Sequence, residues 1–147
     1  LVKRQAEVEL LPLAEHEGLA VFPYNTIAAG MLTGKYLDGQ SGRLNEVEMY
    51  RQRYADSRYV EVTRRFVAYA REKNLSPAAL AVAWVMHHPA VTAPIIGARN
   101  LEQFHDTLQC LDLPLCAEIR DEITALSIAP PLATDREDMT AMKVRGW

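Results

Sequence analysis

The sequence predicts an α/β protein in which parallel strands alternate with helices. Residues 19–22 form a continuous apolar run bounded by Gly18 and Pro23, as expected of a short strand buried on both faces of a parallel sheet, and residues 91–96 read as a second buried strand. Apolar residues around these runs recur at helical spacing instead. We therefore expect right-handed crossovers, in which a helix connects one strand to the next.

The composition indicates a protein that acts on small molecules. The chain has 147 residues, 49% of them hydrophobic, which is enough for one domain with its own core. Its formal net charge of −3 gives no long-range attraction for nucleic acid or anionic lipid. No stretch approaches the ~18 apolar residues of a membrane-spanning helix. We accordingly expect neither a nucleic-acid partner nor a membrane partner.

The cysteines and histidines indicate a reducing compartment and no metal. Cys110 and Cys116 lie in a connection between two predicted helices, and the first residues do not resemble a secretory leader. The expectation is a cytoplasmic protein with reduced thiols. No metal site is predicted, because His87 and His88 are helical neighbours that point about 100° apart and lack further ligands at metal-binding spacing.

The first predicted helix covers residues 5–17. Val8 and Ala14 follow helical spacing, and Gly18 lies where a left-handed residue ends a helix. The first predicted strand begins directly after this glycine. Residues 25–45 then form an extended loop rich in Gly, Thr, Ser and Asp, and loops of that length are usually functional.

The second predicted helix covers residues 59–73. Asp56 or Ser57 supplies the N-cap oxygen, and Asn74 is a plausible terminator.

The third predicted helix opens at Ser76 and Pro77. Serine supplies the N-cap oxygen, and proline occupies the first helical position, where no N–H is needed. This helix is apolar over much of its surface, so we expect it to pack against something large, and Pro89 ends it. In the following strand, Pro94 is tolerated only at an edge, an end or a bulge.

Two more helices complete the prediction. Asn100 and Gln103 have the spacing of a capping box, which predicts a helix to about Leu111. Residues 115–126 follow as one more amphipathic helix, and the tail at 129–147 shows mixed charge and little periodicity.

The predicted sheet is too small to stand alone. Two parallel strands cannot close a barrel and would leave apolar faces and backbone edges exposed. Further strands come from the rest of a longer chain, from association of several copies, or from segments assigned above to loops. Because the sequence begins at Leu1, we expect a fragment; the alternative is a processed or trimmed small protein.

Two strand-to-helix junctions, residues 22–36 and 94–103, carry the strongest functional signal. Each places glycine, small side chains and a cation just past an apolar run. Exposed N–H groups and the N-terminus of a following helix attract anions at such positions. The junctions therefore predict a phosphorylated ligand, and neither contributes an acid, a base or a nucleophile.

Both junctions resemble segments of aldo-keto reductases. Residues 24–36, Tyr-Asn-Thr-Ile-Ala-Ala-Gly-Met-Leu-Thr-Gly-Lys-Tyr, resemble the loop after the seventh strand, and residues 97–106 resemble the segment after the eighth. Residues 5–19 are similar to the helix and turn before the seventh strand, and the pattern is that of the bacterial branch related to potassium-channel beta subunits. The resemblance implies the C-terminal portion of a (β/α)8 TIM barrel. Residues 1–128 would be its cofactor-binding C-terminal half, and residues 129–147 a tail that is a candidate substrate loop.

The resemblance also implies that both junctions bind one NADP molecule. In the first junction, an aromatic ring would stack on the nicotinamide, backbone amides would line the pyrophosphate, and cations would contact phosphate. The implied residues are Tyr24, Asn25, Thr26, Ile27, Ala28, Gly30, Lys35 and Arg43. The alternatives are a core tyrosine at 24 and a merely solvated lysine at 35.

In the second junction, Arg99 would bind a 2′-phosphate in bidentate fashion, which favours NADP over NAD. Gly97 and Ala98 would pass beneath the ribose, Gln103 would add a polar contact, and Asp106 would accept from the adenine amino group. The alternatives are that Gln103, with the preceding asparagine, only caps its helix, and that Asp106 is only an exposed first-turn carboxylate.

The implied function is hydride transfer from NADPH to an aldehyde or ketone substrate. The family's catalytic Tyr, Asp, Lys and His lie on the first four strands, to which no part of this sequence corresponds, so no catalytic residue is assigned. The partner would be the missing N-terminal half, and the isolated chain is expected to be inactive. Thr26 and Thr107 stand where the family usually has Pro and Asn. These departures keep open a non-enzymatic NADP-sensing or assembly module, while a third alternative is a helical interaction domain.

Overall fold

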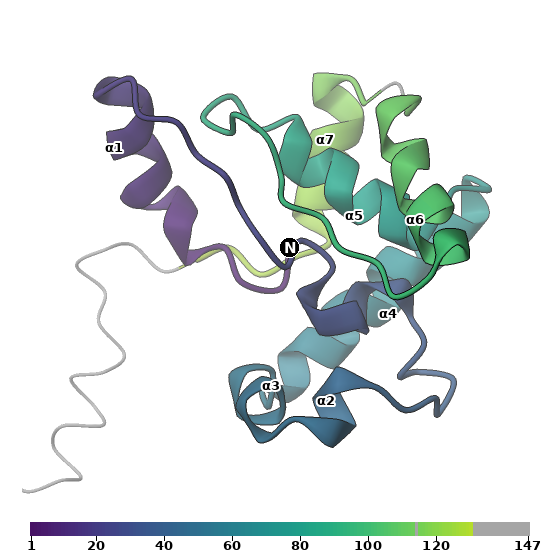
Figure 1. Ribbon diagram of the computed structural model, residues 1–147. Coiled ribbons are helices and arrows are strands. Elements are labelled where there is room, and N and C mark those ends of the chain that lie inside the picture. Colours follow the sequence, from purple (N-terminus) through teal and green to yellow (C-terminus); the bar gives the residue numbers. More distant parts are fainter. Residues whose placement is uncertain (114, 131–147) are drawn as a thin grey trace, which may run out of the picture.

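The computed structural model describes residues 1–113 and 115–130, and these residues form a mostly helical assembly (Figure 1). No strand is assigned within these ranges; one isolated parallel bridge joins Tyr24 to Ile95. The elements in chain order are η1 (Gln5–Glu7), α1 (Leu10–His16), η2 (Ala28–Thr33), α2 (Arg43–Glu46), α3 (Glu48–Arg53), α4 (Ser57–Glu72), α5 (Pro77–Met86), α6 (Leu101–Leu108), η3 (Gln109–Leu111) and α7 (Ala117–Ala125).

The hydrophobic core lies between α4, α5 and the η2 segment. Phe66 of α4 and Leu80 of α5 have no exposed surface, and Leu32 of η2 is 1% exposed. The α5 helix is buried around most of its circumference, as its apolar composition predicts. Ile123 of α7 joins the same cluster, as do Leu1 and Val2, so both ends of the described chain pack on one core.

The caps of α4 and α5 confirm the sequence prediction. The Asp56 carboxylate accepts from the Arg58 amide at 2.9 Å, and Ser76 Oγ accepts from the Ala79 amide at 3.2 Å. Each cap satisfies an N–H group that has no partner within its own helix. Asn74, two residues after the end of α4, adopts the left-handed conformation, with φ of 55°.

The first predicted helix is divided into η1 and α1. Gly18 has φ of 65°, as expected for the residue that ends a helix. The Leu19 amide donates to the Ala14 carbonyl at 2.8 Å, and the Gly18 amide donates to that of Glu15 at 3.4 Å. This is the Schellman pattern, in which glycine permits the chain to reverse and enter the extended segment.

The prediction of two buried strands is wrong. Leu19, Phe22 and Ile95 are 58%, 54% and 55% exposed, respectively. The two segments run side by side in the predicted parallel direction (Figure 1), and the Ile95 amide donates to the Pro23 carbonyl at 2.7 Å. They remain exposed because no further strand lies beside them within the described residues. Burial on both faces requires sheet and helices that this part of the chain does not supply.

The long loop predicted at residues 25–45 is more compact than expected. It contains η2 and α2, and all five residues from 28 to 32 are buried. The segment is thus a packed connection rather than an open loop. Of the predicted tail, residues 131–147 lie outside the described residues.

Candidate functional site

The two junctions meet at one pocket, which we call the cation pocket. Its volume is about 90 Å³. The first junction and the loop that follows it contribute five of the lining residues and the second junction four: Ile27, Ala29, Gly30, Lys35 and Arg43, with Gly97, Ala98, Arg99 and Gln103. Segments separated by more than 50 residues in the sequence therefore form a single small concavity of the size that suits a phosphate-bearing group.

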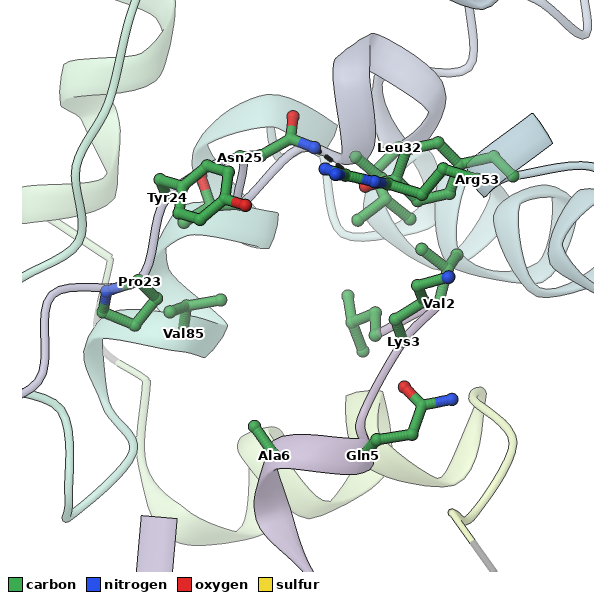
Figure 2. A pocket seen from close by; sticks show the side chains of 14 residues that line it. Val2, Lys3, Gln5, Ala6, Pro23, Tyr24, Asn25, Leu32, Arg53 and Val85 are labelled. Atoms are coloured by element: carbon green, nitrogen blue, oxygen red, sulfur yellow. Dashed lines mark hydrogen bonds between the residues drawn. The ribbon is translucent and has the colours of Figure 1, made fainter. Parts of the chain in front are cut away.

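Two larger hollows adjoin the start of the first junction. One, of about 210 Å³, lies between residues 24–27 and residues 95–97. The other, of about 420 Å³, is lined by Tyr24 and Asn25 together with Val2, Lys3 and Arg53, among others; Figure 2 shows these side chains around its rim. We call the second one the tyrosine hollow.

Every residue predicted to bind the cofactor lines one of these hollows or a neighbouring one. Tyr24, Asn25 and Thr26 line both larger hollows, and Ala28 lines the tyrosine hollow. Gln103 also lines a shallow depression on α6 with Asp106. The predicted set therefore forms a continuous track over the surface.

Tyr24 is presented to solvent rather than packed in the core. Its side chain is 68% exposed, and the side chains of Phe22 and Ile95 in the same pair of segments are more than half exposed as well. An exposed ring at the end of an extended segment is free to stack on a flat ligand.

Positive charge dominates the cation pocket. Lys35, Arg43 and Arg99 all line it. The Lys35 ammonium lies 4.8 Å from the centre of the Tyr36 ring, a cation–π distance. A methyl group added at Gly42 would collide with this ammonium and with the Tyr36 hydroxyl, so glycine is required for the lysine to occupy this position.

The η2 backbone follows an unusual path. Ala28, Ala29 and Gly30 all have positive φ, at 51°, 57° and 89°. Two consecutive alanines in the left-handed region cost roughly 1–2 kcal/mol each, and such strain concentrates at functional sites. The structure holds these residues in place by burying them next to α5.

Three amides that the resemblance assigns to the pyrophosphate are already engaged within the loop. The Ala28 amide donates to the Asn25 carbonyl at 2.9 Å, the Ala29 amide to Asn25 Oδ1 at 2.7 Å, and the Gly30 amide to the Ile27 carbonyl at 3.0 Å. Since an N–H donates one strong hydrogen bond, anion attraction in this pocket comes mainly from the three cationic side chains.

Asn25 connects the loop to α3. Its own φ is 58°, and its Nδ2 donates to the Tyr54 hydroxyl at 2.8 Å (Figure 2, dashed line). Burial raises the pKa of the Tyr54 phenol above its ordinary value. Asn25 therefore shapes the loop with both ends of its amide.

In the second junction, the caps predicted as alternatives are present. Asn100 Oδ1 accepts from the Gln103 amide at 2.9 Å, and Gln103 Oε1 accepts from the Arg99 amide at 3.1 Å. Gln103 thus fixes the backbone that carries Arg99, and a ligand contact is left to its amide nitrogen.

Sequence reasoning missed two residues, Tyr36 and Glu46. The Tyr36 hydroxyl donates to the Ala29 carbonyl at 3.0 Å and accepts from the Leu44 amide at 3.2 Å, which ties α2 to η2. Glu46 approaches Arg99, with 3.9 Å between Oε2 and Nη2. Tyr36 is the last residue of the motif at residues 24–36. Nothing in the sequence indicated that Glu46 is the partner of Arg99.

The described residues contain neither a membrane-spanning helix nor a cluster of metal ligands. Each described helix is too short or too polar to span a lipid bilayer. Within the same ranges, no three His, Cys, Asp or Glu side chains lie close enough to hold a metal ion. Cys110 is buried and Cys116 exposed, and both are free thiols.

Comparison with known proteins identifies relatives over most of the chain. The sequence model of the aldo/keto reductase family matches residues 1–128. The chain is 35% identical over 124 residues to "Uncharacterized oxidoreductase YrpG" of Bacillus subtilis, covering 81% of this chain and 35% of that protein. It is 31% identical over 128 residues to "Protein tas" of Escherichia coli, covering 86% of this chain and 37% of the relative.

A third relative is the "Probable voltage-gated potassium channel subunit beta" of Oryza sativa. It is 33% identical over 141 residues, which cover 90% of this chain and 43% of the relative. The chain thus spans less than half the length of these relatives. It belongs to the aldo/keto reductase family, whose fold is a (β/α)8 barrel and which includes named oxidoreductases.

Proposed function

We propose that this chain is the cofactor-binding part of an NADP-dependent aldo-keto reductase, which transfers hydride from NADPH to an aldehyde or ketone. The observation that carries the proposal is the cation pocket, where two distant junctions place Lys35, Arg43 and Arg99 around a single cavity of about 90 Å³. Three cations at one small cavity suit a ligand with several phosphate charges.

The order of the hollows supports one direction for the proposed dinucleotide. Tyr24, exposed beside the tyrosine hollow, would stack on the nicotinamide and leave one ring face open to substrate. Lys35 and Arg43 would neutralise the pyrophosphate, Arg99 would bind the 2′-phosphate, and Asp106 would accept from the adenine amino group. NADPH supplies the hydride when bound.

The exposed parallel segments support a C-terminal position in the barrel. Leu19, Phe22 and Ile95 present apolar side chains of the kind that a closed sheet buries. We propose that further β/α units of the full-length protein cover them and that the acid which protonates the carbonyl oxygen lies in those units. A homo-oligomer is the other arrangement that would cover this edge.

NADPH-dependent chemistry and two free thiols suit a reducing compartment such as the cytoplasm. Residues 129–147 remain our candidate for a loop that closes over the substrate.

Steady-state reduction of a panel of aldehydes and ketones by the full-length protein tests the proposal. Consumption of NADPH is followed by the absorbance of the reduced nicotinamide, with NADH in parallel reactions. We expect turnover with NADPH and weaker turnover with NADH. The 147-residue chain alone should bind NADPH without turnover, and carbonyl reduction by this chain alone would show that our assignment of the catalytic groups is wrong. Binding without turnover by the full-length protein would instead indicate an NADP sensor.

A further inference from the structure

We infer that Glu46 is a specificity-determining residue that opposes a phosphate at Arg99 and thereby lowers the preference for NADP over NAD. The inference rests on the proposed function, because it takes Arg99 as the residue that receives the 2′-phosphate. It adds a side chain that the family resemblance did not point to and that acts against the cations of the pocket.

The geometry places one carboxylate beside the cation pocket. Glu46 Oε2 lies 3.9 Å from Arg99 Nη2, and the two side chains are 53% and 56% exposed. At this distance and exposure, the pair itself contributes little to folding stability. Glu46 matters because of where its carboxylate lies: any anion bound by Arg99 must approach the Glu46 charge as well.

The α2 backbone is tied to the pocket wall, so the backbone of Glu46 is held beside the pocket. The Tyr36 hydroxyl joins the Ala29 carbonyl to the Leu44 amide, at 3.0 and 3.2 Å. The Glu46 amide itself donates to the Gly42 carbonyl at 3.0 Å. Because Ala29 lines the cation pocket, these bonds connect the backbone of Glu46 to that lining.

The effect of this carboxylate depends on what the cofactor carries on its ribose. A 2′-phosphate brings close to two negative charges, which must displace Glu46 from Arg99 and then remain near it. A 2′-hydroxyl carries no charge and donates a hydrogen bond that a carboxylate accepts. Glu46 therefore disfavours NADP and is neutral or favourable towards NAD.

Glu46→Gln in the full-length protein tests the inference, with equilibrium binding followed by the fluorescence of NADPH and of NADH. We expect the Kd for NADPH to fall by about three- to tenfold, as expected when a like charge is removed from a partly screened site. The Kd for NADH should stay equal or rise. The gain for NADPH should shrink at ~1 M salt, where the Debye length is about 3 Å.

Glu61→Gln is the matched control. Glu61 forms comparable exposed ion pairs on α4, including one to Arg65 at 3.6 Å, and it lines neither the cation pocket nor the adjoining hollows. This variant should change neither Kd. Adenosine 2′,5′-bisphosphate, used as a competitor, should gain affinity for Glu46→Gln as NADPH does, because it carries the same 2′-phosphate.

The possible results distinguish a failure of this inference from a failure of the proposed function. If the wild-type protein binds neither dinucleotide, the proposed function fails, and the inference fails with it. If the wild type binds NADPH but Glu46→Gln leaves its Kd unchanged, raises it, or lowers the Kd values for NADPH and NADH equally, the inference alone is overturned.

Discussion

Phe66 and Phe22 illustrate the difference between the two regions of this molecule. Phe66 lies at the centre of the helical layer formed by α4, α5 and η2 and has no exposed surface. Phe22 lies in the extended segment after α1 and is 54% exposed, alongside Leu19 and Ile95. Helices satisfy their own backbone and need one apolar partner, whereas parallel strands need neighbours on both edges and cover on both faces. The helical layer is therefore complete within the described chain, and the extended pair is not.

The largest expected effect on stability comes from replacing the buried Phe66 with alanine, and the same change at the exposed Phe22 is the comparison. Phe66→Ala should lower the free energy of unfolding of the 147-residue chain by about 3–5 kcal/mol, because it removes a fully buried ring and leaves a cavity. Phe22→Ala in the same chain should cost about 1 kcal/mol or less, since half of the ring is already in water. Denaturant unfolding followed by circular dichroism measures both.

The same substitution of Phe22 in the full-length protein tests whether the extended pair is covered there. If further strands pack against the extended pair, Phe22→Ala should there cost about 3 kcal/mol, close to the value for a buried ring. An effect in the full-length protein as small as that in the 147-residue chain would contradict the proposal that this edge is covered.

A smaller difference in stability is expected between alanine substitutions at two glycines that both have positive φ. Gly34 and Gly18 have φ of 85° and 65°. A methyl group at Gly34 would lie 3.0 Å from Cγ2 of Val67 in the helical layer, whereas a methyl group at Gly18 meets nothing within 4 Å. Gly34→Ala should therefore cost roughly 2–4 kcal/mol, through left-handed strain together with overpacking. Gly18→Ala should cost only about 1–2 kcal/mol of strain.

Thermal unfolding of the two glycine variants checks this prediction. Equal losses of stability would mean that the contact with Val67 relaxes freely, and the helical layer would then be less tightly packed around η2 than the structure indicates.

Local signals in the sequence were sufficient for α4 and α5. Asp56 and Ser76 cap the helices that they were predicted to cap, because a side-chain oxygen reaches an amide only two or three residues away. The apolar run at 19–22 gave the correct extended path and parallel direction but the wrong burial. Burial of a strand depends on residues far away in the sequence, and a local pattern does not contain them.

The candidate site likewise combines features that the local sequence predicted with features that depend on distant residues. The residues of both junctions were predicted from motif, and the structure brings part of each junction to one pocket. The roles of individual amides were less accurate, because Asn25 occupies the Ala29 amide through a side-chain hydrogen bond. The pair formed by Glu46 and Arg99 spans 53 residues, and no spacing rule connects them.

The central claim is that both junctions hold the same dinucleotide. Titration of NADPH into the full-length wild type, Lys35→Ala and Arg99→Ala tests it most directly, with Arg64→Ala on α4 as a control for the loss of an exposed arginine. We expect one binding site per chain and a Kd raised about tenfold or more by either junction variant, as expected for losing a hydrogen bond to a charged group. The control should bind like the wild type. Absence of NADPH binding, or a Kd that responds to only one junction, would contradict the account.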